Sequence, residues 1–131
     1  MLQQISESEL VLMKIIWKNE GTALYSQIIE QLEQDNALWK KNTVLTLLSR
    51  LIEKNYLKIR KIGRRNEYIA LVKEEEYQTT QTHSFLTKVF GGNVKNLVST
   101  LLQHDILSAE ELREVEEYWA EISQSSGKEP K

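Results

Sequence analysis

The chain has 131 residues and a formal net charge of −2, and its lack of cysteine excludes disulfides, thiol nucleophiles and thiolate metal sites. It has no glycine-rich phosphate loop and no nucleophile–base spacing, and His83 and His104 lie too far apart in sequence to suggest a metal pair, so we expect no enzyme, cofactor or metal. Without a run of about 18 apolar residues or a signal-peptide pattern, the protein is expected to be soluble and cytoplasmic, with no membrane partner.

The first predicted helix begins after Ser6. Glu9 follows three residues later, and the two residues form a capping box, in which each side chain bonds the backbone N–H of the other. Apolar residues continue as far as Trp17, and the helix is expected to end near Asn19. Gly21 then supplies the left-handed conformation that ends a helix without strain.

Two more helices are predicted to follow. Thr22 is expected to cap the second helix, which the turn residues Asp35 and Asn36 close. The third helix is predicted from about Lys41 to Lys54, with apolar residues at steps of three and four and a polar opposite side. Its apolar stripe, which we expect to be buried, consists of Val44, Leu47, Leu48 and Leu51.

A β-hairpin is predicted next, in the segment "YLKIRKIGRRNEYIAL" from Tyr56 to Leu71. Its apolar and basic residues alternate on the way to a turn around Gly63, which indicates two short strands with a basic tip. The aromatic residues Trp17, Trp39 and Tyr68 sit on apolar faces, so we interpret them as core residues and not as base-stacking surfaces.

The basic residues are concentrated in the third helix and the hairpin. Residues 40–65 contain nine of the 17 Lys and Arg residues and one acid, Glu53, so this stretch has a net charge of +8 in an acidic chain. Such a field favours a polyanionic partner, and a winged helix-turn-helix places a helix and a hairpin on DNA. The residues expected to bind DNA are Lys40, Lys41, Asn42, Thr43, Thr46, Arg50, Arg60, Arg64 and Arg65.

The segment 82–122 is predicted to form three short amphipathic helices, the last opened by a second capping box, Ser108 with Glu111. Short helices need a partner for their apolar stripes, and we expect pairing with a second copy, with one larger monomeric core as the alternative. The expected domains are a winged helix-turn-helix at 1–72, a helical dimerisation domain at 73–122 and a disordered tail at 123–131. The residues expected at the dimer interface are Phe85, Leu86, Phe90, Leu97, Leu101, Leu102 and Val115.

The leading interpretation is therefore a mainly α-helical, sequence-specific transcriptional repressor that binds DNA as a homodimer. A winged-helix module that uses its basic patch on an acidic protein partner is the alternative from another class. A ligand-sensing regulator would need a pocket-forming region between the helices and the wing, and the sequence offers none.

The sequence resembles the penicillinase- and methicillin-resistance repressor family (BlaI/MecI type) over residues 5–118. The resemblance implies a dimeric repressor that binds inverted repeats in double-stranded operator DNA, at the promoters of antibiotic-resistance genes or of its own operon. It also implies a sensor-linked protease as a further partner. The matching residues are "ISESELVLMKIIWK" (5–18), Trp39, "NTVLTLLSRLIEKNYL" (42–57), "GRRNEY" (63–68) and "THSFLTKVFGGNVKNLV" (82–98).

The sequence departs from the family pattern at three places. The family usually has Ser-Pro-Lys ahead of its recognition-helix threonine, where this chain has Lys40, Lys41 and Asn42. The copper-responsive branch uses a cysteine-rich metal site, which a chain without cysteine cannot form. Members induced by β-lactams are cut at an Asn-Phe bond, and the aligned position in this chain is Thr100-Leu101.

Overall fold

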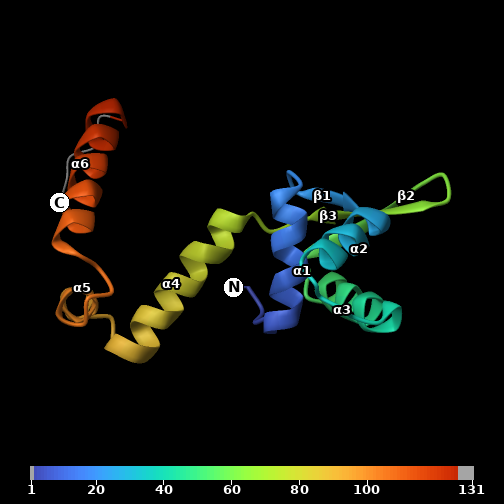
Figure 1. Cartoon of the computed structure of the whole chain (residues 1–131), viewed down its shortest axis with the longest axis horizontal. Coiled ribbons are helices and arrows are strands. Elements are labelled where there is room, and N and C mark those ends of the chain that lie inside the picture. Colours follow the sequence, from blue (N-terminus) through green and yellow to red (C-terminus); the bar gives the residue numbers. More distant parts are fainter. Residues whose placement is uncertain (1, 127–131) are drawn as a thin grey trace. The chain divides into compact units, whose positions relative to one another are not determined.

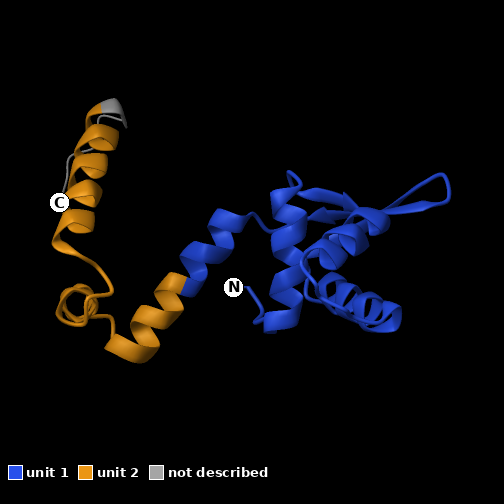
Figure 2. Ribbon diagram, viewed as in Figure 1, with its two compact units in different colours: residues 1–81 blue, residues 82–131 orange. Residues whose placement is uncertain are grey.

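Residues 2–126 are described by the computed structural model, and they form helices with a small β-sheet, as the sequence predicts. The chain divides into two units, a first unit (Met1–Gln81) and a second unit (Thr82–Lys131) (Figure 2). In chain order the elements are α1 (Glu7–Lys18), β1 (Thr22–Leu24), α2 (Tyr25–Gln34), α3 (Lys41–Glu53), β2 (Leu57–Ile62), β3 (Arg65–Ala70), α4 (Glu74–Phe90), α5 (Val94–Gln103) and α6 (Ala109–Ser126) (Figure 1).

Helix α1 has the predicted capping box. The Ser6 hydroxyl accepts from the Glu9 N–H at 3.1 Å, and Glu9 Oε1 accepts from the Ser6 N–H at 2.9 Å. At the other end the first left-handed residue is Glu20, with φ +62°, and Gly21 follows at φ +88°. The Gly21 N–H donates to the Ile16 carbonyl at 2.9 Å, the bond that closes a Schellman motif.

The expectation that Thr22 caps α2 is wrong, because Thr22 begins strand β1. This strand pairs antiparallel with β3, and Thr22 lies opposite Ile69. Pairing with β3 extends the backbone here, so α2 begins only at Tyr25. The side chain of Gln27 takes over the capping role, since its Oε1 accepts from the Leu24 N–H at 2.8 Å.

The hairpin of β2 and β3 is the wing of the first unit (Figure 1). The sheet order is β1-β3-β2, and all pairings are antiparallel. Ile62 lies opposite Arg65, so the loop contains only Gly63 and Arg64. Gly63 has φ +62° at the first loop position, and the tight two-residue turns that match strand twist need a positive φ there.

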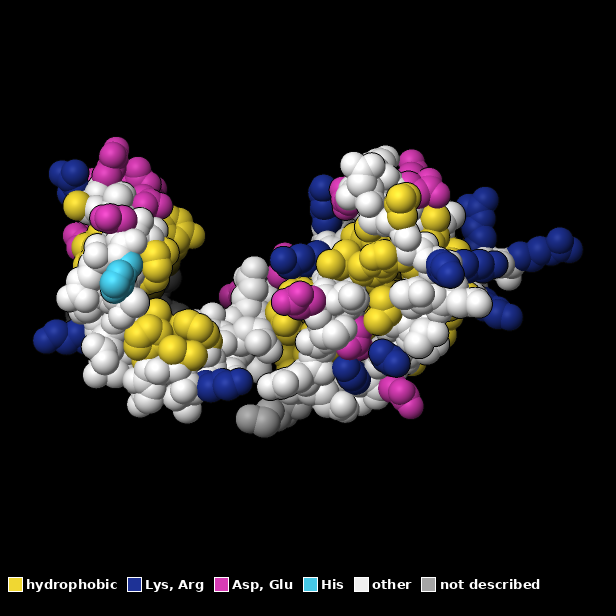
Figure 3. Space-filling model, turned by 60° about the horizontal axis from the view of Figure 1, so that its bottom comes forward, with side chains coloured by type: hydrophobic (Ala, Val, Ile, Leu, Met, Phe, Trp, Pro, Cys, Tyr) yellow, Lys and Arg dark blue, Asp and Glu magenta, His cyan; other side chains and the backbone are white. Residues whose placement is uncertain are grey.

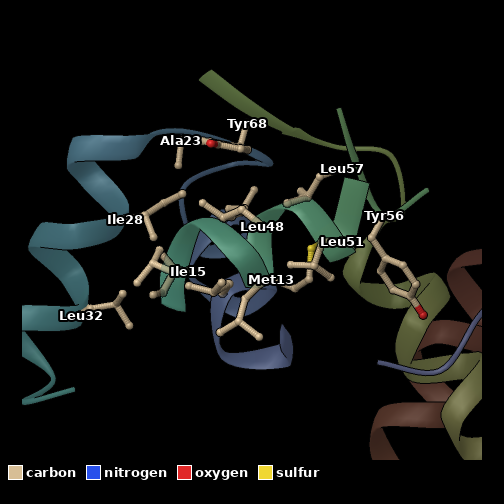
Figure 4. Packing of buried hydrophobic residues seen from close by; sticks show 14 of the residues in the cluster. Met13, Ile15, Ala23, Ile28, Leu32, Leu48, Leu51, Tyr56, Leu57 and Tyr68 are labelled. Atoms are coloured by element: carbon tan, nitrogen blue, oxygen red, sulfur yellow. The ribbon is translucent and has the colours of Figure 1, made fainter. Parts of the chain in front are cut away.

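The core of the first unit forms where α3 meets α1, α2 and the sheet (Figure 4). The predicted stripe of α3 is buried, with the exposed fraction at most 7% at each position. Tyr68 is also buried, and Trp17 and Trp39 pack half-buried against the cluster, as expected. The stripe consists of Val44, Leu47, Leu48 and Leu51.

The start of α4 belongs to the first unit. Trp17 Nε1 donates to the Val72 carbonyl at 2.8 Å, and the ring of Tyr77 lies 5.6 Å from that of Trp17 and 6.2 Å from that of Tyr56. These contacts explain why the first unit runs to Gln81, whereas the sequence predicts a DNA-binding domain that ends at Val72.

The second unit contains the rest of α4, with α5 and α6. Helix α4 is longer than the short helix expected, because no glycine or proline interrupts residues 74–90. The second capping box is confirmed, with Ser108 and Glu111 bonded to each other's backbone N–H at 3.0 Å. The sequence predicts a tail from Ser123, but α6 continues to Ser126; residues 127–131 lie outside the described part of the chain.

An ion pair ties the start of α1 to the end of α3. Glu9 is 2% exposed, and its Oε1 lies 2.9 Å from Lys54 Nζ. Burial alone would raise the pKa of Glu9, but hydrogen bonds from Ser6 and Lys54 outweigh it, and the pKa falls below its ordinary value of 4.5. Nearby, burial raises the pKa of Tyr56, whose hydroxyl donates to the Gln3 carbonyl at 2.6 Å. Through Gln3 and Glu9, the N-terminal part of the chain thus holds the residues that follow α3 in place.

Glu9→Gln is expected to lower the free energy of unfolding at pH 7 by about 1–3 kcal/mol, because a charged buried hydrogen bond is lost. A carboxyl group whose pKa is lowered by folding stabilises the folded state fully at pH values above its ordinary pKa. This contribution to the free energy of unfolding disappears as the pH falls through the pKa of the folded state. The difference between wild type and variant should therefore shrink on acidification below about pH 4.5. Urea unfolding across pH measures it. Glu7→Gln, an exposed change in the same helical turn, is the control, and equal stability of Glu9→Gln and wild type at pH 7 would contradict the prediction.

Candidate nucleic-acid interface

The exposed side of α3 carries the predicted contact residues. Because the apolar stripe faces the core, the residues between its members point outward. Lys40 is the N-cap of α3 and makes no side-chain capping bond, and the first turn holds no acid, so the helix start has no negative charge of its own to repel an anion. The exposed residues here are Lys40, Lys41, Asn42, Thr43, Thr46 and Arg50.

The wing carries the other three predicted contacts, Arg60, Arg64 and Arg65, and all three are exposed. Basic side chains gather along the hairpin of the first unit in Figure 3. Lys58 and Lys61 are also exposed on β2. The predicted contact set omits both lysines, although they belong to the same basic run of residues 40–65.

Two of the nine basic residues in the stretch 40–65 are already paired. Arg60 Nη2 lies 2.5 Å from Glu67 Oε1, directly across the β2–β3 ladder, and Lys54 is bonded to Glu9. The other seven have no ion pair within the described residues. Their charge is therefore available to a partner, and the side chains are Lys40, Lys41, Arg50, Lys58, Lys61, Arg64 and Arg65.

A shallow hollow of about 310 Å³ opens on the outer side of α3. Residues three and four apart share a helix face, so the hollow follows one ridge of the helix. Leu47, which is 7% exposed, contributes apolar surface between polar neighbours. The lining residues are Asn42, Thr43, Thr46, Leu47 and Arg50.

The residues predicted for dimerisation lie on all three helices of the second unit. Phe85 and Phe90 are on α4, with ring centroids 5.9 Å apart, and Phe85 is 50% exposed. Leu102 on α5 is 36% exposed and Val115 on α6 is 56% exposed. The half-buried members of the set are Leu86, Phe90, Leu97 and Leu101.

The bond Thr100-Leu101 lies inside α5. Both residues are half-buried, and Thr100 Oγ1 donates to the Asn96 carbonyl at 2.9 Å. A protease needs an extended peptide, so α5 would have to unwind locally before this bond could enter an active site.

Neither a metal site nor a membrane span emerges from the described residues. Within positions 2–126 no three His, Cys, Asp or Glu side chains gather to hold a metal ion. No helix there has both the length and the apolar character needed to cross a bilayer. The exposed groups on α3 and on the β2–β3 hairpin are cations, an amide and hydroxyls, which are suited to binding a polyanion.

Comparison with known proteins matches residues 5–121 to the family described as penicillinase repressor. The chain is 35% identical over 114 residues to the penicillinase repressor of Bacillus licheniformis, with 87% of this chain and 88% of that protein covered. It is 30% identical over 112 residues to the methicillin resistance regulatory protein MecI of Staphylococcus aureus (strain N315), with 86% and 89% covered.

Two solved structures are similar to part of the chain, each at 35% sequence identity. The solution structure of the DNA-binding domain of the repressor BlaI gives a TM-score of 0.51 and covers 59% of this chain and 94% of its own. The Bacillus licheniformis BlaI monomeric form in complex with the blaP half-operator gives 0.50, with 59% and 92% covered. The winged-helix fold predicted from the sequence is thereby confirmed.

Proposed function

The chain belongs to the penicillinase repressor family, whose members are DNA-binding transcriptional repressors, and we propose that it represses transcription as a homodimer bound to an inverted-repeat operator. The observation that carries the proposal is a set of seven basic side chains on α3, at its N-cap and on the wing, which have no ion pair among residues 2–126 of an otherwise acidic chain. The structure of BlaI in complex with a half-operator, which is similar to 59% of this chain at 35% identity, supports the proposal.

Recognition is proposed to follow the usual division between phosphate and base contacts. Helix α3 has 13 residues, which at about 1.5 Å per residue makes it long enough to cross a major groove. Asn42 and Arg50 carry the amide and the guanidinium that pair bidentately with adenine and guanine. Lys40 and Lys41 at the helix start and the arginines of the wing are assigned to phosphates or the adjacent minor groove.

The homodimer is supported by the composition of the second unit. Every buried hydrophobic side chain of the described residues lies between Leu12 and Val72, so the second unit contributes none. Apolar side chains that remain this exposed favour association with another surface. A second copy is the simplest occupant, because a two-fold axis gives two α3 helices the spacing of an inverted repeat. Figure 3 shows one such hydrophobic patch on the second unit.

The regulated genes and the inducing partner are proposed from the relatives. Their names point to penicillinase and methicillin resistance, so we propose antibiotic-resistance genes as targets. The proposed function involves no catalysis and takes place in the cytoplasm, where bacterial operators lie. A sensor-linked protease remains a proposed partner, but cleavage at Thr100-Leu101 would require α5 to unwind first.

Fluorescence anisotropy on the inverted repeat nearest the protein's own promoter tests the proposal, with a scrambled duplex as control and several salt concentrations. We expect tighter binding to the repeat, with two protomers per duplex. Equal, strongly salt-dependent binding to both duplexes would indicate a nonspecific binder. Absence of binding at low salt would favour the protein-interaction module.

Arg64→Ala is expected to weaken operator binding more than Arg60→Ala, because Arg60 is already held by Glu67. Each lost phosphate contact should reduce the slope of log affinity against log salt by about 0.9. The two variants control for each other, since both remove an exposed arginine from the same hairpin. An equal or larger loss for Arg60→Ala would show that the Glu67 pair opens on DNA, contrary to this prediction.

A further inference from the structure

The hollow on α3 combines an apolar wall with polar rims. Leu47 and the methyl groups of Thr43 and Thr46 provide hydrocarbon, and the two hydroxyls provide hydrogen-bonding groups beside it. Within the described residues neither hydroxyl has a hydrogen-bond partner, in contrast to Thr100, whose hydroxyl bonds its own helix backbone. The hollow therefore offers a small apolar surface, the 7% of Leu47 that remains exposed and the threonine methyl groups, beside two hydroxyls that can donate or accept.

Arg50 is the single charged residue of the lining. A phosphate in the hollow would meet one cation and would lie against the Leu47 side chain, which cannot satisfy its oxygens. The edge of a base suits this lining better, since hydrophobic contact and hydrogen bonding are both needed within a few ångströms.

Among the four bases, thymine alone presents a methyl group in the major groove, together with the O4 acceptor. Adenine and guanine present only polar atoms there, and cytosine presents an amino donor without the methyl. We propose that the hollow is a thymine subsite, in which the 5-methyl group lies against Leu47 and Thr46 and a threonine hydroxyl donates to O4. The inference rests on the proposed function, because it needs α3 in the major groove of an operator.

The test replaces each operator thymine in turn by deoxyuridine, which removes only the 5-methyl group and leaves base pairing intact. We expect one thymine in each half-site to be sensitive. Its replacement in a single half-site should lower wild-type affinity about four-fold, the value of one buried methyl group. Substitution at both symmetric positions should multiply the losses to about sixteen-fold. Anisotropy with the full-length chain measures each ratio.

Two protein variants locate the contact. Thr46→Ser keeps the hydroxyl and removes the methyl group. At the contacted thymine, the ratio of affinities for the thymine and the deoxyuridine operators should therefore fall from about four towards one. Ser49→Ala, an exposed change on α3 outside the hollow, should leave the loss unchanged. Both positions are exposed, so neither change should affect folding.

The possible failures can be told apart. If the protein selects the inverted repeat but tolerates deoxyuridine at every thymine, the subsite is refuted and the repressor function stands. If the deoxyuridine effect is the same in Thr46→Ser as in wild type, the methyl lies elsewhere and the placement is refuted. If the protein does not select the repeat at all, the proposed function falls and the subsite with it.

Discussion

A chain carrying Phe85→Asp and Leu102→Asp is expected to be monomeric and to bind its operator at least about a hundred-fold more weakly than the wild type. Both side chains are exposed in the single chain, at 50% and 36%, so aspartate should cost the monomer little. In a dimer each would place a charge without a partner in an apolar interface. The operator would then be bound by two independent half-site events, without the effective concentration that linkage provides.

Sedimentation equilibrium gives the oligomeric state of this double variant, and anisotropy on the whole operator gives the affinity. Leu71→Asp is the matched control, because it places the same charge at an exposed apolar residue of the first unit, 49% exposed. It should remain dimeric. A wild-type chain that sediments as a monomer would support the alternative in which the C-terminal helices complete one larger core.

Arg50→Ala is expected to weaken binding by about ten- to a hundred-fold for each half-site, the usual value of a bidentate arginine–guanine pair. Arg50 is exposed and has no ion pair in the part of the chain that the structure describes. Its backbone carbonyl accepts from the Lys54 N–H at 2.9 Å, a bond that any variant can keep. The thermal midpoint should therefore stay near that of the wild type.

Arg50→Lys separates base reading from phosphate binding. Lysine keeps the charge but lacks the planar fork, so it should restore the salt dependence without restoring the preference for the operator. Full recovery of selectivity in Arg50→Lys would assign Arg50 to a phosphate. Unchanged affinity in both Arg50→Ala and Arg64→Ala would refute our placement of the interface on α3 and the wing.

Local sequence signals were enough for most of the first unit. The Ser6–Glu9 capping box, the buried stripe of α3 and the hairpin turn at Gly63 each depend on residues close together in the chain. The same is true of the exposed basic face, because a buried stripe at helical spacing decides which residues point outward. The family resemblance added operator binding, which these patterns alone indicate only by charge.

Contacts between distant residues decided the rest. Strand β1 is three residues long and forms because β3 lies beside it. Threonine is common in strands, but nothing near Thr22 in the sequence identifies β3 as the partner. The pairs Glu9–Lys54 and Arg60–Glu67 remove two of nine basic residues from the available charge, and only the packing of α1 on α3 and the register of the hairpin reveal them. The hollow beside Leu47 likewise depends on the rotation of α3 about its own axis relative to the core. Sequence determined the elements and their polar faces because those are local, and tertiary structure alone decided which charges and surfaces remain free for DNA.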